Sequence, residues 1–465
     1  MADNRTIENA ARGDKGATIA LLKRRARWAP EEIARFRGGE PDAVARAQAF
    51  VQALDAERLA KKAAYEAAKV NRTPRGPGLP PAPLVVVGDH DERTREQLAR
   101  CLDHDDAVAG ALCADGHLGY SQPVGGVVAY REHVSVSGVG YDIACGNLAV
   151  QTDVPFGAVR DRVGTILDDV VARVSFGLGR KNASRVEHPI FDDEEAWRAA
   201  GVADALRKRA EEQLGTVGAG NHYVNLHVEV REDLPEEAWP VWIGIHFGSR
   251  GLGHTLATRY LRLGGGRDGV DMPPTLLHQD SDLGRGYLAA MDLAGRYAYA
   301  GREWVASQVL HVLGAGEAQR VHNHHNFAWR EIVDGAPAWV VRKGCTPAFP
   351  GQRGFVGGSM GDDAVILEGV EGEGAAALLH STVHGAGRVM SRTQAKGTLS
   401  RAEMEAWLRR KGVVLRGGDL DEAPMAYRRL PEVLAHHAGT IRVLHTLRPV
   451  GVAMAGRDVK DPYQD

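Results

Sequence analysis

The segment VWIGIHFGSRGLGH, residues 241–254, contains the pattern that decides the fold. A run of apolar and β-branched residues ends at His246, and the stretch from Gly248 to Arg250 then begins a helix-like segment. Short apolar runs that are bounded by glycine are typical of buried strands. The segment therefore predicts a strand, a glycine turn and the start of a helix, with His246 where the strand ends.

The same texture recurs from Leu84 onward. Short β-branched runs alternate there with glycine turns and with helical segments, which is typical of a mixed α/β protein. The clearest helices are expected over residues 193–214, 284–313 and 400–412. Ser400 and Glu403 have the spacing of a capping box at the start of the last one. The other expected strands are 84–88, 125–130, 338–344, 364–369 and 441–454.

The first part of the chain differs from the rest. Residues 1–71 are rich in alanine, Val44, Val51 and Leu54 have helical spacing, and Pro30 can occupy a first helical turn. The segment RTPRGPGLPPAP, residues 72–83, then interrupts the pattern with closely spaced prolines that cannot continue a helix. We predict a helical N-terminal extension, a proline-rich linker and an α/β domain over residues 84–465.

Charge and composition exclude several protein classes. The 57 basic residues nearly balance the 60 acidic ones, so a site for a polyanion has to be local rather than spread over the whole surface. The chain has 4 cysteines without a C-x-x-C pair, and its N-terminus has no signal-peptide core, which favours the reducing cytoplasm. No apolar run is long enough to span a membrane.

Four segments carry candidate metal ligands. Asp142 and Cys145 are three residues apart in GVGYDIACGN, in what we expect to be a strand-to-turn context. Each segment has a plain structural explanation by itself, such as a buried cysteine beside an aspartate that stabilises a turn. Together they favour two metal sites that share the thiolate, and a thiolate with imidazoles suits Mn, Fe, Co or Zn better than Mg or Ca. The histidine candidates are His222, His246, and one or more of His322, His324 and His325.

His384 is a candidate nucleophile toward phosphorus. It lies in HSTVHGAGRVMSR, residues 380–392, where glycines leave space beside the imidazole. A neutral imidazole can attack a phosphoryl group. Arg388 and Arg392 follow four and eight residues later, so on a helix they would share one face with His384 and neutralise phosphate. The alternative is a structural turn histidine with two solvated arginines.

Read in order, these segments resemble the RtcB family of RNA ligases, from about residue 90 to 456. The resemblance implies an RtcB-like fold for the α/β domain, which would be the catalytic domain. It also implies a cytoplasmic enzyme of RNA repair or tRNA splicing that joins RNA 3′-phosphate or 2′,3′-cyclic phosphate ends to 5′-hydroxyl ends. The motifs are ADGHLGYSQPVGGV, GVGYDIACGN, GTVGAGNHYV, HFGSRGLGH, HNFA, VRKGCTPAFPG, GGSMG, STVHGAGRVMSR, EAPMAY and LRPVGV.

The resemblance also implies roles for single residues. His384 would take GMP from GTP, and Asn221 and Asn326 would contact phosphate. An activating protein of the archease type accompanies many members of the family and is a candidate partner. Two manganese ions would be held by Asp142, Cys145, His222, His246 and His325, with Cys145 as the bridge. The remaining nucleotide-binding positions would be Asn225, Ser359, Met360, Gly385, Arg388, Tyr427 and Met454.

Some positions depart from the family pattern, and they cluster around the nucleotide base. Asn225 stands where the family has a glutamate, and Met454 stands where it commonly has a lysine. Asp362 and Asp363 replace a threonine and small residues. These departures predict that the GTP selectivity is relaxed or changed. Two other functions stay open, namely a metal-dependent phosphoesterase for RNA ends that does not ligate and an RNA-end binding protein.

Overall fold

The computed structural model describes most of the chain, namely residues 2–70, 80–267 and 269–456. The chain divides into two compact units, one made chiefly of residues 1–71 and the other chiefly of residues 72–465. Most of the expected linker, residues 72–79, lies outside the described residues, and residues 80–83 have no regular secondary structure. The domain boundaries that we infer from the sequence stay a prediction.

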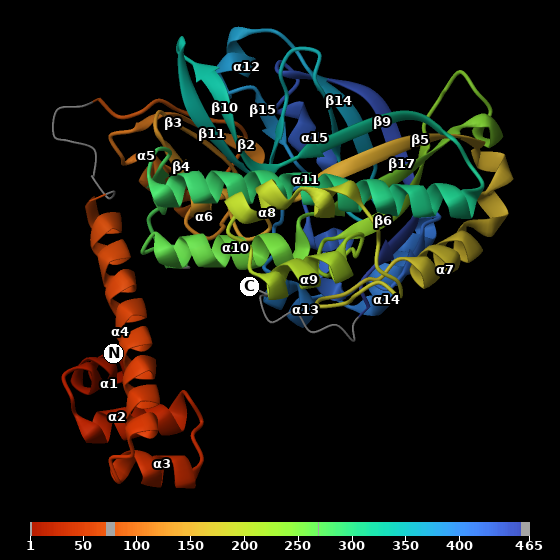
Figure 1. The fold of residues 1–465 in the computed structure, drawn as a ribbon. Helices are drawn as coiled ribbons and strands as arrows, with labels where there is room; N and C mark the ends of the chain where they lie inside the picture. Colours follow the sequence, from red (N-terminus) through yellow and green to blue (C-terminus); the bar gives the residue numbers. More distant parts are fainter. Residues whose placement is uncertain (1, 71–79, 268, 457–465) are drawn as a thin grey trace. The chain divides into compact units, whose positions relative to one another are not determined.

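The unit of residues 1–71 is helical, as Figure 1 shows. Pro30 occupies the first turn of its third helix as expected, and Asp14 caps the second helix by accepting a hydrogen bond from the Ala17 backbone N–H at 2.9 Å. Leu21 and Leu22 are fully buried among the helices. The helices are α1 (Ala2–Ala11), α2 (Lys15–Arg24), α3 (Pro30–Arg37) and α4 (Pro41–Val70).

The second unit is built on a large mixed sheet. Its strands pair in the order β13-β14-β17-β6-β7-β5-β9, all antiparallel, and β16 pairs parallel to β17. The strands are β5 (Gly146–Pro155), β6 (Tyr223–Glu229), β7 (Pro240–Phe247), β9 (Glu317–His324), β13 (Arg353–Val356), β14 (Ala364–Gly369), β16 (Val414–Arg416) and β17 (Ile441–Met454).

A second sheet has the order β1-β2-β3-β11-β10, and only its β1–β2 pair is parallel. Two short strand pairs, β12–β15 and β4–β8, complete the β structure of the described residues. The strands are β1 (Leu84–Val86), β2 (Ala107–His117), β3 (Val124–Tyr130), β4 (His133–Ser135), β8 (Leu276–His278), β10 (Asn326–Val333), β11 (Ala336–Lys343), β12 (Cys345–Pro347) and β15 (Ser381–Val383).

Helices surround the sheets, and the long α11 (Asp282–Leu313) packs against β7 and β5 (Figure 1). Its buried residues belong to two of the hydrophobic clusters of this unit, so one helix joins these two parts of the core. Within the described residues, no helix is both long enough and apolar enough to cross a membrane. The others are α5 (Glu92–Leu102), α6 (Val136–Val139), α7 (Val163–Arg173), α10 (Arg250–Leu263), α12 (Glu373–Ala377), α13 (Arg392–Thr398), α14 (Arg401–Lys411) and α15 (Leu430–Ala435).

The mixed α/β fold is confirmed, and so are the expected strands and the helices near 284–313 and 400–412. Ser400 and Glu403 form the expected capping box of α14. The single helix expected over 193–214 is wrong, because two helices occur there, α8 (Glu194–Ala199) and α9 (Asp204–Gln213). Gly201 lies between them with a φ of +62°, a left-handed conformation that ends the first helix.

The large sheet brings distant segments to one edge. The first residue of β5, Gly146, pairs with Phe247 at the end of β7 and with His324 at the end of β9. A Cβ atom at Gly146 would lie 2.3 Å from the Asn323 carbonyl oxygen, so this close approach requires glycine. Tyr223, the first residue of β6, pairs with His246. The residues beside these strand ends therefore converge, although they are far apart in the sequence.

Candidate active site

A cavity of about 640 Å³ opens at this sheet edge. Glycine loops and strand ends line it together, because side chains at converging strand ends point into the same space. All the site residues that the family resemblance implies lie in its wall, namely Asp142, Cys145, Asn221, His222, Asn225, His246, His325, Asn326, Ser359, Met360, His384, Gly385, Arg388, Tyr427 and Met454.

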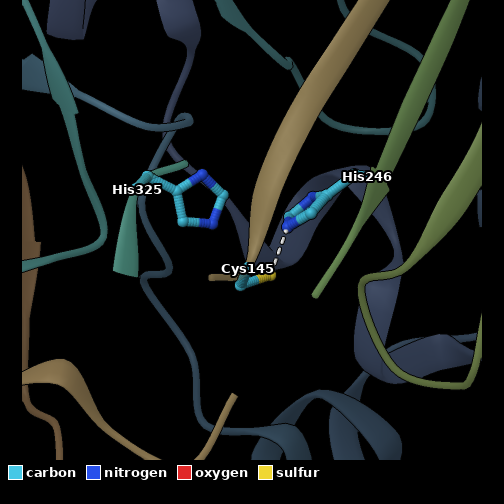
Figure 2. A group of neighbouring side chains, drawn as sticks. All are labelled: Cys145, His246 and His325. Carbon is cyan, nitrogen blue, oxygen red and sulfur yellow. Dashed lines mark hydrogen bonds between the residues drawn. The ribbon is translucent and has the colours of Figure 1, made fainter. Parts of the chain in front are cut away.

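Two groups of potential metal ligands share the Cys145 thiol. In the first, Cys145, His246 and His325 offer ligand atoms that all lie within 4.8 Å of one another, and Figure 2 shows their side chains converging. In the second, Asp142 and His222 lie equally close to Cys145. We call these groups the histidine trio and the aspartate trio. His322 and His324 belong to neither.

The distances between single side-chain atoms show how close together the potential metal ligands lie. The Cys145 Sγ atom lies 3.2 Å from His246 Nε2 and 3.6 Å from His222 Nε2. His222 Nε2 also lies 3.0 Å from Asp142 Oδ2. On the other side of that imidazole, Arg250 at the start of α10 contacts Nδ1 at 3.0 Å. This contact turns the Nε2 atom of His222 toward both Asp142 and Cys145.

The turn that carries Asp142 and Cys145 comes before β5 and not after a strand, so the expected strand-to-turn order is wrong. The Cys145 backbone N–H donates to the Asp142 carbonyl at 3.0 Å. Ala144, between them, has a φ of +61°, which residues other than glycine rarely adopt. This turn brings the carboxylate and the thiol to the same side of the chain.

The protonation states of the donors fit a divalent metal. Burial lowers the pKa of both His246 and His325 well below its usual value, so both imidazoles are neutral and keep a lone pair. Burial opposes ionisation of Asp142, but the His222 hydrogen bond and charge outweigh it and lower the pKa to about 2. The buried Nδ1 atom of His325 has no hydrogen-bond partner among the described residues. Imidazole, carboxylate and thiol donors in this arrangement suit a borderline metal ion.

Burial raises the pKa of the Cys145 thiol well above its usual value. The thiol is therefore protonated at neutral pH unless a cation lies beside it. A thiolate is the form that binds a metal, so ion binding at either trio has to release this proton.

His384 lies beside the histidine trio, with its ring centroid 4.9 Å from that of His325. Its Nδ1 atom is 2.7 Å from the fully buried carboxylate of Asp115, which also accepts the His384 backbone N–H at 3.0 Å. Burial opposes ionisation of Asp115, but the charge and hydrogen bonds of His384 lower its pKa. The ionised carboxylate requires the proton on Nδ1, so in the neutral imidazole the lone pair lies on Nε2.

Sequence reasoning missed Asp115, although it lies in the motif ADGHLGYSQPVGGV. The only signal was a carboxylate beside a histidine in a glycine-rich segment. Such a pattern does not indicate which distant side chain the carboxylate contacts. His384 is its partner only because β2 and β15 meet in the fold.

The expected common helical face for His384, Arg388 and Arg392 is wrong. Residues 384–391 form no helix, and α13 begins only at Arg392. Glycines open this loop, and Gly387 has a φ of +76°. Both arginines still line the cavity, as part of its loop wall.

Protein groups already bind both arginines. Arg388 donates to the Tyr427 hydroxyl and to the Asp421 carbonyl, each at 2.7 Å. Arg392 pairs with the carboxylates of Asp421 and Glu422. A phosphate would have to compete with these partners for the guanidinium groups.

The remaining predicted residues form the polar and apolar walls of the cavity. The Asn326 side-chain oxygen accepts the Gly344 backbone N–H at 2.7 Å, so this amide holds two loops together. Ser359 donates to Asp362 at 2.7 Å, and Arg429 pairs with the same carboxylate at 2.6 Å. The departure at Asp362 therefore has a structural partner on each side.

Two of the positions that depart from the family pattern, Asn225 and Met454, line the cavity on the paired strands β6 and β17, whereas Asp362 and Asp363 do not line it. Asn225 is buried, and its side-chain oxygen has no hydrogen-bond partner among the described residues. Met360 and Met454 belong to a hydrophobic cluster that also contains Leu408 of α14. This wall consequently offers an amide and two thioethers where a ligand would meet it.

Comparison with known proteins identifies the family. The family model described as tRNA-splicing ligase RtcB matches residues 97–200 and 192–455. The tRNA-splicing ligase RtcB of Thermococcus kodakarensis is 31% identical over 415 residues, which cover 73% of this chain and 86% of the relative. The RNA-splicing ligase RtcB of Mycobacterium tuberculosis is 31% identical over 411 residues, which cover 72% of this chain and 94% of the relative. With this similarity extending over the α/β unit and its cavity, the chain belongs to the RtcB family.

Proposed function

We propose that this protein is an RNA ligase that joins RNA 3′-phosphate or 2′,3′-cyclic phosphate ends to 5′-hydroxyl ends, in RNA repair or tRNA splicing. The observation that carries the proposal is the cavity in which His384, hydrogen-bonded to Asp115, faces two ligand trios that share Cys145. The names of the relatives, which are tRNA-splicing or RNA-splicing ligases, support the same activity.

The two trios would hold two manganese ions. His246 and His325 would complete one site and Asp142 with His222 the other, and Cys145 would belong to both. When bound, the ions supply Lewis-acid charge that stabilises phosphoryl oxygens during displacement at phosphorus. The short distance between the His325 and His384 rings would keep that charge beside the nucleophile.

His384 would act as a nucleophile toward GTP. Its Nε2 lone pair attacks the α-phosphorus, a P–N bond forms, and pyrophosphate leaves. The imidazole becomes positively charged in this step, because Nδ1 keeps its proton. The buried Asp115 carboxylate lies at hydrogen-bonding distance from Nδ1 and stabilises that charge.

The later steps return His384 to its starting state. An oxygen of the RNA 3′-phosphate attacks the phosphorus, the P–N bond breaks, and GMP is transferred to the RNA end. The 5′-hydroxyl then attacks the RNA phosphorus, loses its proton, and displaces GMP. A cyclic phosphate would first be hydrolysed to the 3′-phosphate. GMP is needed because a phosphate monoester is a poor electrophile until its leaving group is improved.

The choice of nucleotide is proposed to be relaxed toward bases other than guanine. A carboxylate accepts two hydrogen bonds from guanine, whereas the Asn225 amide offers one donor and one acceptor. Asn225 belongs to the cavity wall, and its buried side-chain oxygen lacks a hydrogen-bond partner among the described residues, which a donor group of a base that reached it would supply. An amide of this kind can pair with adenine as well.

The decisive experiment incubates the full chain with manganese and either α-labelled GTP or α-labelled ATP, and then locates the label by mass analysis. We expect label on His384, and none in a His384→Ala variant. His380→Ala is the matched control, because His380 stacks on Phe349 and does not line the cavity. The same assay, with an archease-type protein added, measures any dependence on that activator.

The outcomes separate the candidate functions. Label from GTP alone supports the ligase with guanine selectivity, and label from both nucleotides supports relaxed selectivity. Metal-dependent opening of a cyclic phosphate without any protein label would replace the ligase by a phosphoesterase. Ligation that persists in His384→Ala contradicts the proposed mechanism.

A further inference from the structure

Arg302 is a fully buried arginine in α11 that donates hydrogen bonds to three separate segments. Its Nη1 atom donates to the Ala144 carbonyl at 3.1 Å and to the Phe247 carbonyl at 2.6 Å. Its Nε atom donates to His322 at 2.8 Å, and its Nη2 atom to His324 Nδ1 at 3.0 Å. One planar guanidinium thus ties α11 to the turn before β5, to the end of β7 and to the end of β9.

Three of these four partners are each next in the chain to one member of the histidine trio. We propose that Arg302 is the positioning residue that holds the histidine trio in its ligand geometry from outside the site. This role rests on the proposed metal site. The adjacent pairs are Ala144–Cys145, Phe247–His246 and His324–His325.

The burial of Arg302 is explained only in part by its contact with the Tyr299 ring, whose centroid lies 5.2 Å from the guanidinium carbon. Within the described residues no carboxylate forms an ion pair with it, since the neighbouring Glu303 pairs with Arg320 at 3.1 Å and approaches His322 at 3.6 Å. Burial lowers the pKa of Arg302 to about 10, so the guanidinium is still charged at neutral pH. Because an apolar side chain of similar volume usually serves packing as well as a buried charge, packing alone does not account for this arginine.

The conformation of Ala144 shows what the arginine holds in place. The left-handed φ of Ala144 is unfavourable and persists only where surrounding groups fix it. Its N–H donates to the Asn326 carbonyl at 2.8 Å, and its own carbonyl accepts from Arg302. Without Arg302, we expect the Ala144 carbonyl to lose this donor, the turn to relax, and the Cys145 thiol to move away from the other two members of the trio.

The test is a titration of the metal-free, full-length protein with Co²⁺, which reports thiolate ligation through a charge-transfer absorption band. We expect the Arg302→Met variant to bind Co²⁺ at least about tenfold more weakly than the wild type, as is typical when an outer-shell partner of a metal ligand is lost. Arg302→Lys should give an intermediate loss, because one ammonium group cannot reach all four acceptors. The band should also weaken or shift in both variants.

Arg342→Met is the matched control. Arg342 is equally buried, but it bonds Glu331, Ser381 and Leu379, none of which is adjacent to a trio member. This variant should lose folding stability and bind Co²⁺ as the wild type does. His324→Phe keeps the ring packing on Phe327 and removes one acceptor of Arg302, so it should lose a smaller part of the affinity. If Arg302→Met does not fold, the Co²⁺ affinities of His324→Phe and Arg302→Lys test the positioning role instead.

Each outcome has a distinct meaning. Equal Co²⁺ affinity and an unchanged band in the folded Arg302 and His324 variants overturn the positioning role and leave the proposed metal site intact. An equal loss in Arg342→Met also overturns it, because the effect would then be one of general destabilisation. A wild-type protein without the band overturns the metal site and this role together.

Discussion

At the scale of single residues, the buried carboxylate of Asp115 determines how the His384 imidazole is presented to the cavity. It accepts hydrogen bonds from Nδ1 and from the backbone N–H groups of His384 and Gly385. These bonds fix both the ring orientation and the tautomer, as the carboxylate does in other histidine-dependent active sites. The proposed reactivity of His384 would therefore depend on a residue that does not itself touch the proposed substrate.

We expect Asp115→Asn to slow the formation of the labelled adduct by a factor of roughly 10²–10⁴, because an amide can stabilise the wrong tautomer and carries no charge. The measurement is the rate of adduct formation at several pH values, with the Co²⁺ titration as a check that the metal site is kept. Asp103→Asn is the control, because Asp103 is exposed and does not line the cavity. Equal rates in Asp115→Asn and the wild type would show that His384 does not need this partner.

A second prediction at this scale concerns the nucleotide. The double variant Asn225→Glu with Met454→Lys should raise the ratio of GTP to ATP labelling about tenfold or more. The physical reason is that a carboxylate accepts from the guanine ring N–H and amino group, and paired hydrogen bonds of this kind discriminate bases by about 1–3 kcal/mol. Competition labelling with both nucleotides measures the ratio. An unchanged ratio would mean that this wall does not contact the base.

At the scale of elements, the short β4 sets the path of the chain into the turn that carries Cys145. β4 pairs with β8 and continues through α6 toward Asp142. Its first residue is held by Asp106, whose carboxylate accepts from the His133 backbone N–H and from His133 Nδ1, each at 2.9 Å. The carboxylate of Asp106, which lies immediately before β2, therefore anchors β4, and β4 leads into the site.

The contact between Asp106 and His133 predicts that the folding stability depends on pH. Burial opposes ionisation of Asp106, but the His133 ring hydrogen bond and the backbone N–H groups of Glu132 and His133 lower its pKa. A lowered folded-state pKa adds stability above the unfolded value and loses it as the pH falls through the folded value. Asp106→Asn should therefore cost about 1–3 kcal/mol of unfolding free energy near pH 7.

The difference between Asp106→Asn and the wild type should begin to shrink below about pH 4, where an aspartate of the unfolded chain takes up a proton, and should shrink further as the pH falls through the lowered folded-state pKa of Asp106. Denaturant unfolding at a series of pH values measures both effects. Asp105→Asn, a neighbouring exposed carboxylate, is the control. A difference that stays constant down to pH 2 would contradict the assigned cause.

At the scale of the whole molecule, each unit has a hydrophobic core of its own. In the described residues, the clusters of the first unit contain only residues from its helices, such as Leu22, Ile33 and Phe36. The clusters of the second unit contain only residues from Ala82 onward. Residues that share a core unfold together, so each unit is expected to unfold as its own cooperative block.

We expect a chain of residues 80–465 to fold, to bind Co²⁺ like the full chain, and to form the His384 adduct. The reason is that every residue of the two trios, and Asp115 and Arg302 as well, lies within that range. Calorimetry, the Co²⁺ titration and adduct labelling measure the three properties. An aggregated or metal-free truncated chain would show that the helical extension is required for the fold of the α/β unit.

The sequence by itself determined the kinds of element and the chemistry of the site. The spacing of apolar residues and the positions of glycines are local features of the sequence. They were therefore enough to predict the strands near 241–247 and 441–454 and the long α11. The candidate metal ligands Asp142, Cys145, His222 and His246 could be named because their side-chain chemistry is visible in the motifs, whereas the choice of His325 came from the family resemblance. Local pattern also has limits. It predicted one helix across Gly201, where two helices occur, and it predicted a helix that carries Arg388, where the chain forms a glycine loop.

Only the tertiary structure decided which residues act together. Asp115 and His384 are 269 positions apart, and Arg302 reaches Ala144 across 158. No sequence window contains both members of such a pair. The contact between Asp115 and His384 follows from the meeting of β2 and β15, whereas the contact between Arg302 and Ala144 follows from the packing of α11 on β5 and β7. Side-chain chemistry is thus a property of each residue, whereas its orientation, charge state and partners depend on how the sheets bring distant strand ends to one edge.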